Sequence, residues 1–228
     1  MRASALAVVL AGLLVAGCGG HGKSASSNSE ASKSANSVLA DAKIAADSAT
    51  SAHVSGSISS GGTPITIDLT MGKGKAKGSM STSGLEFDLI RVGDTAYIRG
   101  SDDFYKHFAG AAVAQLLHGK WLKASIVSGR YASLAPLTSI SDLFGKVASN
   151  HGKLANAGAK TYNGQKVVEI RDTSDSSKLY VAATGKPYPV AIVGGKKNQS
   201  WTISFDNWNK SFSVSPPKDA IDISKLGG

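Results

Sequence analysis

The chain has one cysteine, Cys18, among its 228 residues, and this scarcity excludes several kinds of chemistry. A lone cysteine cannot form an internal disulfide or a thiolate metal cluster. The five histidines are scattered along the chain, and neither an HExxH nor a GxSxG motif occurs. No set of nucleophile and base, or of metal ligands, can be assembled from these residues. We therefore expect a protein that is not an enzyme and has no bound metal or cofactor.

Long hydrophobic runs are also missing, because the longest, 3–15, is shorter than the roughly 20 residues of a membrane-spanning helix. Arg2 precedes this run, and small residues lead to Cys18, which is the layout of an export signal. The stretch Val15-Ala16-Gly17-Cys18 resembles a bacterial lipobox, in which the cysteine is acylated and becomes the new N-terminus. An ordinary apolar helix with an incidental cysteine is the alternative. We expect a signal peptide at 1–17 and a lipidated Cys18 that anchors the chain to the extracytoplasmic face of the cell membrane.

Large apolar residues are absent from 19–35, which is rich in Gly, Ser, Ala and Lys. This composition predicts a flexible tether over 18–35, followed by one domain at 36–228. The net charge of +9 comes mostly from lysine. Nucleic acid is not an expected partner for an exported protein. The lysines either protect strand edges or attract anionic lipid headgroups and wall polymer.

Hydrophobic periodicity predicts an α+β fold. A helical period at 36–50 gives way to apolar–polar alternation, which is clearest at 64–71. Asn163-Gly164 between two alternating runs predicts a hairpin. Helical spacing returns at 104–118 and at 139–149. We expect an antiparallel sheet of about ten or eleven strands with helices covering its apolar face.

The apolar face of this sheet is the candidate site. The helix at 36–50 offers mostly alanines as cover, so the sheet either fills its own interior or leaves a cavity for an apolar ligand. Alternation selects the residues that would line such a cavity. They are Ile65, Ile67, Leu69, Leu85, Phe87, Leu89, Trp201, Ile203 and Phe205.

A family resemblance rests on two segments, VLADAKIAADSATSAHVSGSIS at 38–59 and DTAYIRGSDDFYKHF at 94–108, the second followed by GKWLKAS. Together with the lipobox and tether, they resemble actinobacterial lipoproteins of the LppX/LprG type, within the LolA/LolB-like half-barrel superfamily. The resemblance implies a strongly curved antiparallel half-barrel with helices on its concave face. It also implies a cavity that holds the acyl chains of a lipid or glycolipid, and no catalytic residues. The apolar runs of this chain depart from the pattern, because Gly and Ser interrupt them.

The sequence and the resemblance lead to two alternative functions. The first is a membrane-anchored carrier of acyl-chain lipids or lipidated molecules, with 36–50 and 104–118 as a lid. The second is a structural or sensory lipoprotein with a packed core, which binds envelope polymer or a protein partner that the sequence does not identify.

Overall fold

The computed structural model describes residues 27–60, 63–128, 132, 134–194 and 201–223. The predicted signal peptide at 1–17 and the predicted lipidation site, Cys18, lie outside these residues. Within them, no helix combines the length and apolar character needed to cross a membrane.

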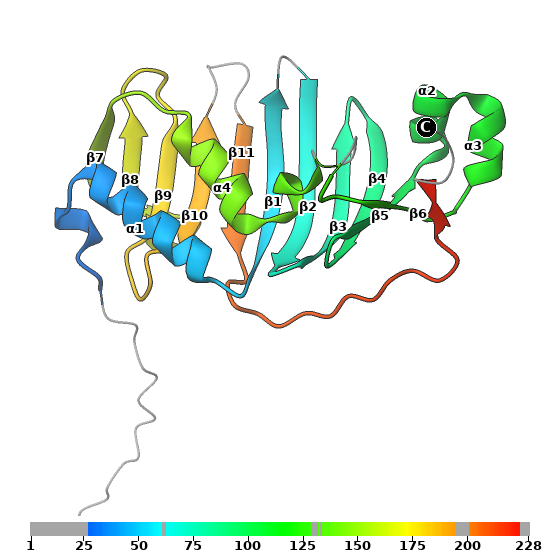
Figure 1. Cartoon of the computed structure of the whole chain (residues 1–228). Coiled ribbons are helices and arrows are strands. Elements are labelled where there is room, and N and C mark those ends of the chain that lie inside the picture. The colour runs from blue at the N-terminus through cyan, green and yellow to red at the C-terminus, as the bar shows by residue number, and fades with distance from the viewer. Residues whose placement is uncertain (1–26, 61–62, 129–131, 133, 195–200, 224–228) are drawn as a thin grey trace, which may run out of the picture.

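The fold is α+β, with one large curved sheet that forms an open half-barrel (Figure 1). Its strand order is β12-β6-β5-β4-β3-β2-β1-β11-β10-β9-β8-β7. The twelve strands are β1 (Ser51–Ser60), β2 (Thr63–Gly72), β3 (Lys75–Thr82), β4 (Leu85–Val92), β5 (Thr95–Gly100), β6 (Leu122–Ser125), β7 (Leu154–Tyr162), β8 (Gln165–Asp172), β9 (Lys178–Ala182), β10 (Pro189–Gly194), β11 (Trp201–Asp206) and β12 (Ile221–Asp222). The predicted fold class is confirmed.

Strand β1 joins the two halves of the sheet, because it pairs antiparallel with β2 on one side and β11 on the other. Only the two-residue β12 departs from antiparallel pairing, and it runs parallel to β6. Strand β12 accounts for the difference between the twelve strands of the structure and the ten or eleven strands expected from the sequence. Its two residues are too short for any alternation to show in the sequence.

Two glycines let neighbouring strands approach closely inside the curved sheet. Gly56 has φ +135° and Gly78 has φ +149°. A Cβ atom at Gly56 would collide with the carbonyl oxygen of Thr202, and one at Gly78 with that of Asp68. Glycine at such positions marks bends and close backbone approaches. These two glycines, which interrupt the apolar runs, therefore allow the sheet to curve into a half-barrel.

The helices lie in two places (Figure 1). Helices α1 (Ala35–Ser48) and α4 (Ile140–Ser149) cross the concave face, with the short helix η3 (Pro136–Thr138) before α4. Helices α2 (Asp102–Ala109) and α3 (Ala111–Leu117) stand at the β5–β6 end. The sequence predicted one helical segment at 104–118. The structure divides it at Gly110, whose φ of +85° lies in the region that glycine favours.

The centre of the concave face is a packed core. Ala42 and Ala46 of α1 are 0% and 2% exposed, and Phe144 of α4 is fully buried with its ring edge-on to Phe205 at 5.7 Å. Of the two alternatives left open by the alanine-rich helix, a filled interior and a cavity, the centre of the sheet has the filled interior. Small side chains let a helix lie close to the sheet, so the missing volume is taken up by approach rather than by a void.

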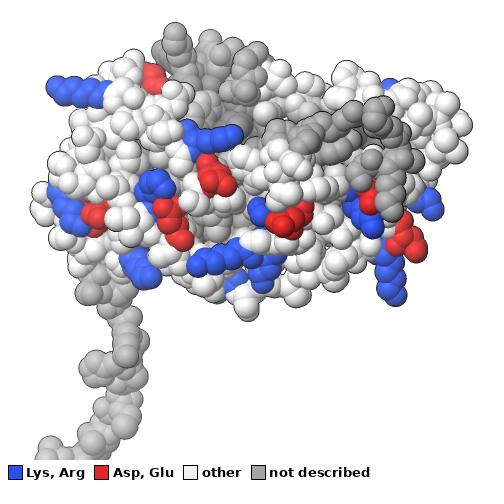
Figure 2. Space-filling view, in the orientation of Figure 1, with Lys and Arg blue, Asp and Glu red and all other residues white. Residues whose placement is uncertain are grey.

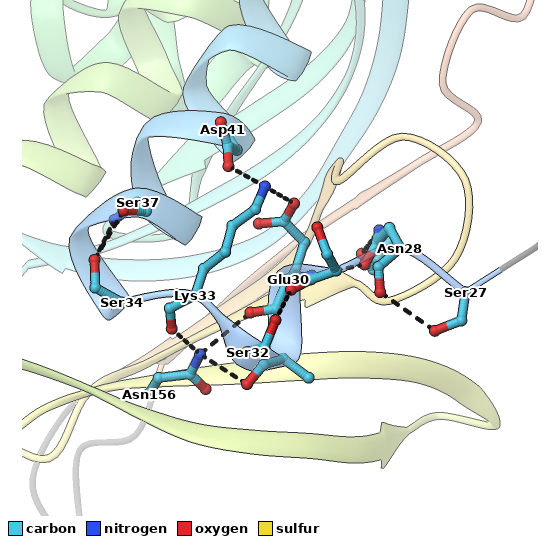
Figure 3. Close-up of polar contacts among 12 residues, drawn as sticks. Ser27, Asn28, Glu30, Ser32, Lys33, Ser34, Ser37, Asp41 and Asn156 are labelled. Carbon is cyan, nitrogen blue, oxygen red and sulfur yellow. Dashed lines mark hydrogen bonds and ion pairs between the residues drawn. The ribbon is translucent and has the colours of Figure 1, made fainter.

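The described part of the predicted tether, from Ser27, lies against the domain (Figure 3). The backbone N–H of Asn28 donates to Ala183, and its side chain donates to the Ala182 carbonyl at 2.9 Å. The Asn156 side chain donates to the Lys33 carbonyl at 2.8 Å and to the Glu30 carbonyl at 3.3 Å. We call residues 27–34 the N-terminal clasp.

The clasp also holds a buried carboxylate. Glu30 is 3% exposed, and one of its oxygens accepts from Lys33 Nζ at 2.7 Å. Hydrogen bonds to Asp41 and Glu30 raise the pKa of Lys33 above its ordinary value. The Lys33 ammonium therefore links the clasp to α1, since Asp41 lies on that helix.

The chain after β11 runs along one rim of the sheet to β6 (Figure 1). Ser51 Oγ donates to the Lys210 carbonyl at 2.6 Å, and Lys75 Nζ donates to the Phe212 carbonyl at 2.8 Å. The Lys75 ammonium also lies 4.5 Å from the centre of the Phe212 ring. This segment delivers β12 and Ile223 to the far end of the sheet.

Candidate functional site

Pockets flank the packed centre at both ends of the concave face. The first, which we call the end pocket, has a volume of about 450 Å³ and lies between α2–α3 and the β5–β6 end of the sheet. This volume falls in the range of about 300–1,000 Å³ that small-molecule pockets have. Its lining residues are Ala96, Ile98, Phe104, Tyr105, Phe108, Ala109, Leu117, Leu122, Ala124, Leu134 and Ile223.

Strands β5 and β6 form the floor of the end pocket. Ala96 pairs with Ala124, and Ile98 pairs with Leu122. Two alanines side by side leave a hollow where larger side chains would fill the space. The alternation in 95–99 thus places one small and one large apolar residue toward the concave side.

Helix α2 forms the wall of the end pocket with three aromatic residues. Ser101 caps this helix by accepting the Phe104 N–H. The Phe104 ring lies over Gly100, where a Cβ atom would collide with it, and its centre is 4.8 Å from that of Phe108 and 5.3 Å from that of Phe87. These tilted ring pairs hold the wall in place.

Tyr105 carries the only polar side-chain atom among the lining residues of the end pocket that the structure describes. Its hydroxyl accepts the Gly100 N–H at 2.9 Å and donates to the Lys120 carbonyl at 3.3 Å. The side chain is 2% exposed, and burial raises the pKa of Tyr105 above its ordinary value. Because both hydrogen bonds go to the backbone, the pocket presents an apolar lining to a ligand.

A second pocket, of about 540 Å³, lies at the β8–β11 end, and we call it the mixed pocket. Its apolar floor includes Ile170, Leu179 and Trp201, whereas Lys146 and Lys178 belong to its polar lining. Its lining residues are Leu39, Lys146, Ala148, Asn150, His151, Leu154, Ile170, Asp172, Asp175, Ser177, Lys178, Leu179, Ile192 and Trp201.

Asp172 is the buried acid of the mixed pocket, at 3% exposure. It accepts the Gly152 N–H at 2.6 Å, and it accepts both the hydroxyl and the N–H of Ser174. These hydrogen bonds, led by that of the Ser174 hydroxyl, lower the pKa of Asp172. The carboxylate is occupied in holding its own loop, so we assign it a structural role.

A third pocket, of about 630 Å³, has a mainly polar lining that includes Asp88, Arg99 and Asp102. Arg99 pairs with Asp88 at 2.7 Å, and His118 pairs with Asp102 at 2.8 Å. Within the described residues, no three His, Asp, Glu or Cys side chains lie close enough to hold a metal ion.

The residues expected to line a cavity are divided between core and pockets. Five of them are at most 3% exposed in the packed centre, and none of these lines any of the three pockets. They are Ile67, Leu69, Leu89, Ile203 and Phe205. Trp201 lines the mixed pocket and Phe87 lines the third one, while Ile65 is partly buried beside the core and Leu85 is half-buried.

Sequence reasoning did not select the lining of the end pocket. Two signals for it were present, namely the alternation of Ala96 and Ile98 and the three aromatic residues in FYKHF at 104–108. The contribution of Ile223 could not be found in this way, because it depends on the path of the chain after β11.

Comparison with solved structures identifies the fold. The crystal structure of LprF from Mycobacterium bovis matches with a TM-score of 0.54 over 80% of this chain and 96% of that chain. This chain has the fold of LprF. The identity is 14%, and the fold confirms the half-barrel that the sequence resemblance implied.

Lipoprotein LppX from Mycobacterium tuberculosis is also similar, with a TM-score of 0.48, 16% identity, and coverage of 79% of this chain and 99% of that chain. No protein-family profile matches the sequence, and no curated protein does either. The match to LprF is therefore one of structure, and at 14% identity it shows the fold alone.

Proposed function

We propose that this chain is a membrane-anchored envelope lipoprotein that binds the acyl chain of a lipid in the end pocket and carries it. The observation that supports this most is the character of the pocket, because its described lining has one polar side-chain atom, the Tyr105 hydroxyl, which is already hydrogen-bonded to backbone groups. The proposed anchor is the lipidated Cys18 expected from the lipobox.

Energetics explain why a carrier needs such a pocket. Each methylene moved from an apolar environment into water costs about 0.8 kcal/mol, so an unprotected chain does not cross water readily. A covered apolar pocket removes this free-energy cost while the lipid is carried through water. In this proposal helices α2 and α3 supply the cover, so that 104–118 acts as a lid at this end of the sheet.

The packed centre favours the alternative, a structural or sensory lipoprotein that binds envelope polymer or a protein partner. Leu69 and Phe144 are fully buried there and leave no space for a ligand beside them. The two functions differ in one measurable property, because only a carrier binds a free lipid.

Titration of the intact chain with monomeric lysophosphatidylglycerol tests the proposal. We expect saturable one-to-one binding with a negative heat-capacity change, which is the mark of apolar burial. Absence of binding at every acyl-chain length would overturn the carrier function and leave the alternative.

A further inference from the structure

Large apolar side chains are exposed at the end of α2 and along α3, next to the end pocket. Phe108 is 62% exposed, Leu116 is 75% exposed and Val113 is 37% exposed. These are three of the five exposed large hydrophobic side chains in the described part of the chain. Large apolar side chains that gather on a surface mark an interaction site, whereas single ones do not.

Charge is absent from the same stretch. Residues 108–117, FAGAAVAQLL, contain no charged residue and only one polar side chain, that of Gln115. On the face that Figure 2 shows, few charged side chains are seen at the α2–α3 end, while most lie across the middle and the lower part of the molecule. We call 108–117 the apolar tip.

Lysines flank the apolar tip in the sequence, where Lys106 precedes it and Lys120 follows it. The carboxylates nearby are at the start of α2, where Asp103 pairs with Lys106 at 3.1 Å and Asp102 pairs with His118 at 2.8 Å. An apolar surface with a lysine at each end of its sequence, one of them paired with Asp103, suits a bilayer with anionic headgroups, since lysine chains reach the headgroup layer while apolar residues enter the acyl boundary.

Phe108 connects this surface with the end pocket. Its ring lines the pocket, although 62% of the residue is exposed to solvent. A side chain in this position stands between the pocket interior and whatever covers the tip. If the tip enters a bilayer, an acyl chain passes Phe108 without crossing water.

The N-terminal clasp and the apolar tip lie at opposite ends of the sheet. The N-terminal clasp lies beside β9, and the apolar tip stands beyond β5 at the opposite end (Figure 1). Eight residues lie between Cys18 and Ser27. The nine Cα-to-Cα steps between these two residues span at most about 30 Å, so a lipidated Cys18 would hold the clasp end near the membrane and leave the other end to make a second contact.

We propose that the apolar tip docks into the surface of an anionic lipid bilayer and opens the end pocket toward it. This inference rests on the proposed carrier function for its purpose. The docking itself is a separate property, and it can be measured without any lipid in the pocket.

The first test places a reporter at one of two matched positions. In the full chain carrying Cys18→Ser, Leu116→Cys or Ile44→Cys is labelled with an environment-sensitive fluorophore. Both residues are exposed hydrophobic helix positions, at 75% and 67%, but Ile44 lies on α1. Protein-free vesicles of equal parts phosphatidylglycerol and phosphatidylcholine are then added. We expect a blue shift at 116 that weakens with salt, and none at 44.

A second test measures transfer. Leu116→Glu is expected to slow extraction of a fluorescent phospholipid from these vesicles by about tenfold or more, because a charge replaces a side chain that enters the acyl boundary. Ile44→Glu is expected to leave the rate unchanged. Both variants keep their binding of monomeric lysophosphatidylglycerol, because neither residue lines the end pocket.

The outcomes separate the two proposals. No shift at 116, an equal shift at 116 and 44, or a shift that appears only with protein-containing membranes would overturn docking to the bilayer. Lysolipid binding with an unshifted 116 label leaves the carrier function and removes the docking. A shifted 116 label without lysolipid binding supports the docking and overturns the carrier function.

Discussion

Filling the end pocket is expected to weaken lipid binding by a calculable amount. Ala124 is 6% exposed on β6 and forms the pocket floor beside Ala96. Ala124→Leu adds three carbon atoms to this floor. The larger side chain occupies the space in which the ligand would otherwise lie.

The magnitude follows from the ligand atoms that are displaced. Three added carbons exclude about three methylenes of the acyl chain, each worth about 0.8 kcal/mol, which gives about 2.4 kcal/mol. At 25 °C this free energy corresponds to a rise of about 60-fold in Kd. The unsubstituted chain should also gain about fourfold in affinity for each methylene added to the ligand, until the pocket is full.

Calorimetric titration with a series of lysophosphatidylglycerols of increasing chain length measures both effects. Ala148→Leu is the matched control, because Ala148 lines the mixed pocket and not the end pocket. An unchanged Kd for Ala124→Leu, with a weakened one for Ala148→Leu, would place the ligand in the mixed pocket. No effect of either substitution would refute binding inside both pockets.

Three further predictions concern stability. Partial burial lowers the pKa of His53, but its hydrogen bonds to the carboxylates of Asp68 and Asp206, at 3.0 and 2.9 Å, outweigh this effect, so the pKa is raised. The resulting stabilisation is complete below the unfolded-state pKa of about 6.5, and it is lost as the pH rises through the folded-state pKa. In urea unfolding experiments, His53→Gln is expected to remove this dependence of the unfolding free energy on pH. Asn156→Ala is expected to cost about 1–3 kcal/mol and to speed hydrogen exchange in residues 28–34, because it frees the carbonyls of the N-terminal clasp. Phe144→Ala is expected to cost about 3–5 kcal/mol in urea unfolding, because this fully buried ring fixes α4 to the sheet.

Each of these has a contrary result. A free energy of unfolding that rises as the pH increases above about 6.5 in the parent chain would contradict the assignment for His53. Unchanged exchange in residues 28–34 would mean that the clasp does not depend on Asn156. A loss of less than about 1 kcal/mol for Phe144→Ala would mean that α4 is not packed as described.

The sheet could be predicted from the sequence because its signals are local. Asn163-Gly164 gives the turn between β7 and β8, with φ of 47° and 78°, and the alternation of 64–71 gives the core-facing side of β2. The break at Gly110 was harder to predict, because a glycine inside a helical pattern often remains part of the helix. Its left-handed φ is what turns one expected helix into α2 and α3.

The site could not be predicted to the same extent, because packing decides it. Alternation identifies which face of a strand points inward, and Leu69 and Phe205 do so as expected. It does not reveal whether a helix then approaches closely, as α1 does, or stands away, as α2 does beside Ala96 and Ala124. The hollow at one end therefore appears only when the three-dimensional arrangement is known.

The central claim is that the end pocket holds a lipid acyl chain, and native mass spectrometry tests it most directly. The chain carrying Cys18→Ser is purified without detergent from a lipid-containing host and compared with the same chain carrying Ala124→Leu. The account predicts an added mass of one acyl-chain lipid on the first protein and a strongly reduced fraction of it on the second. A bare mass for both, unchanged after incubation with phospholipid, would contradict it.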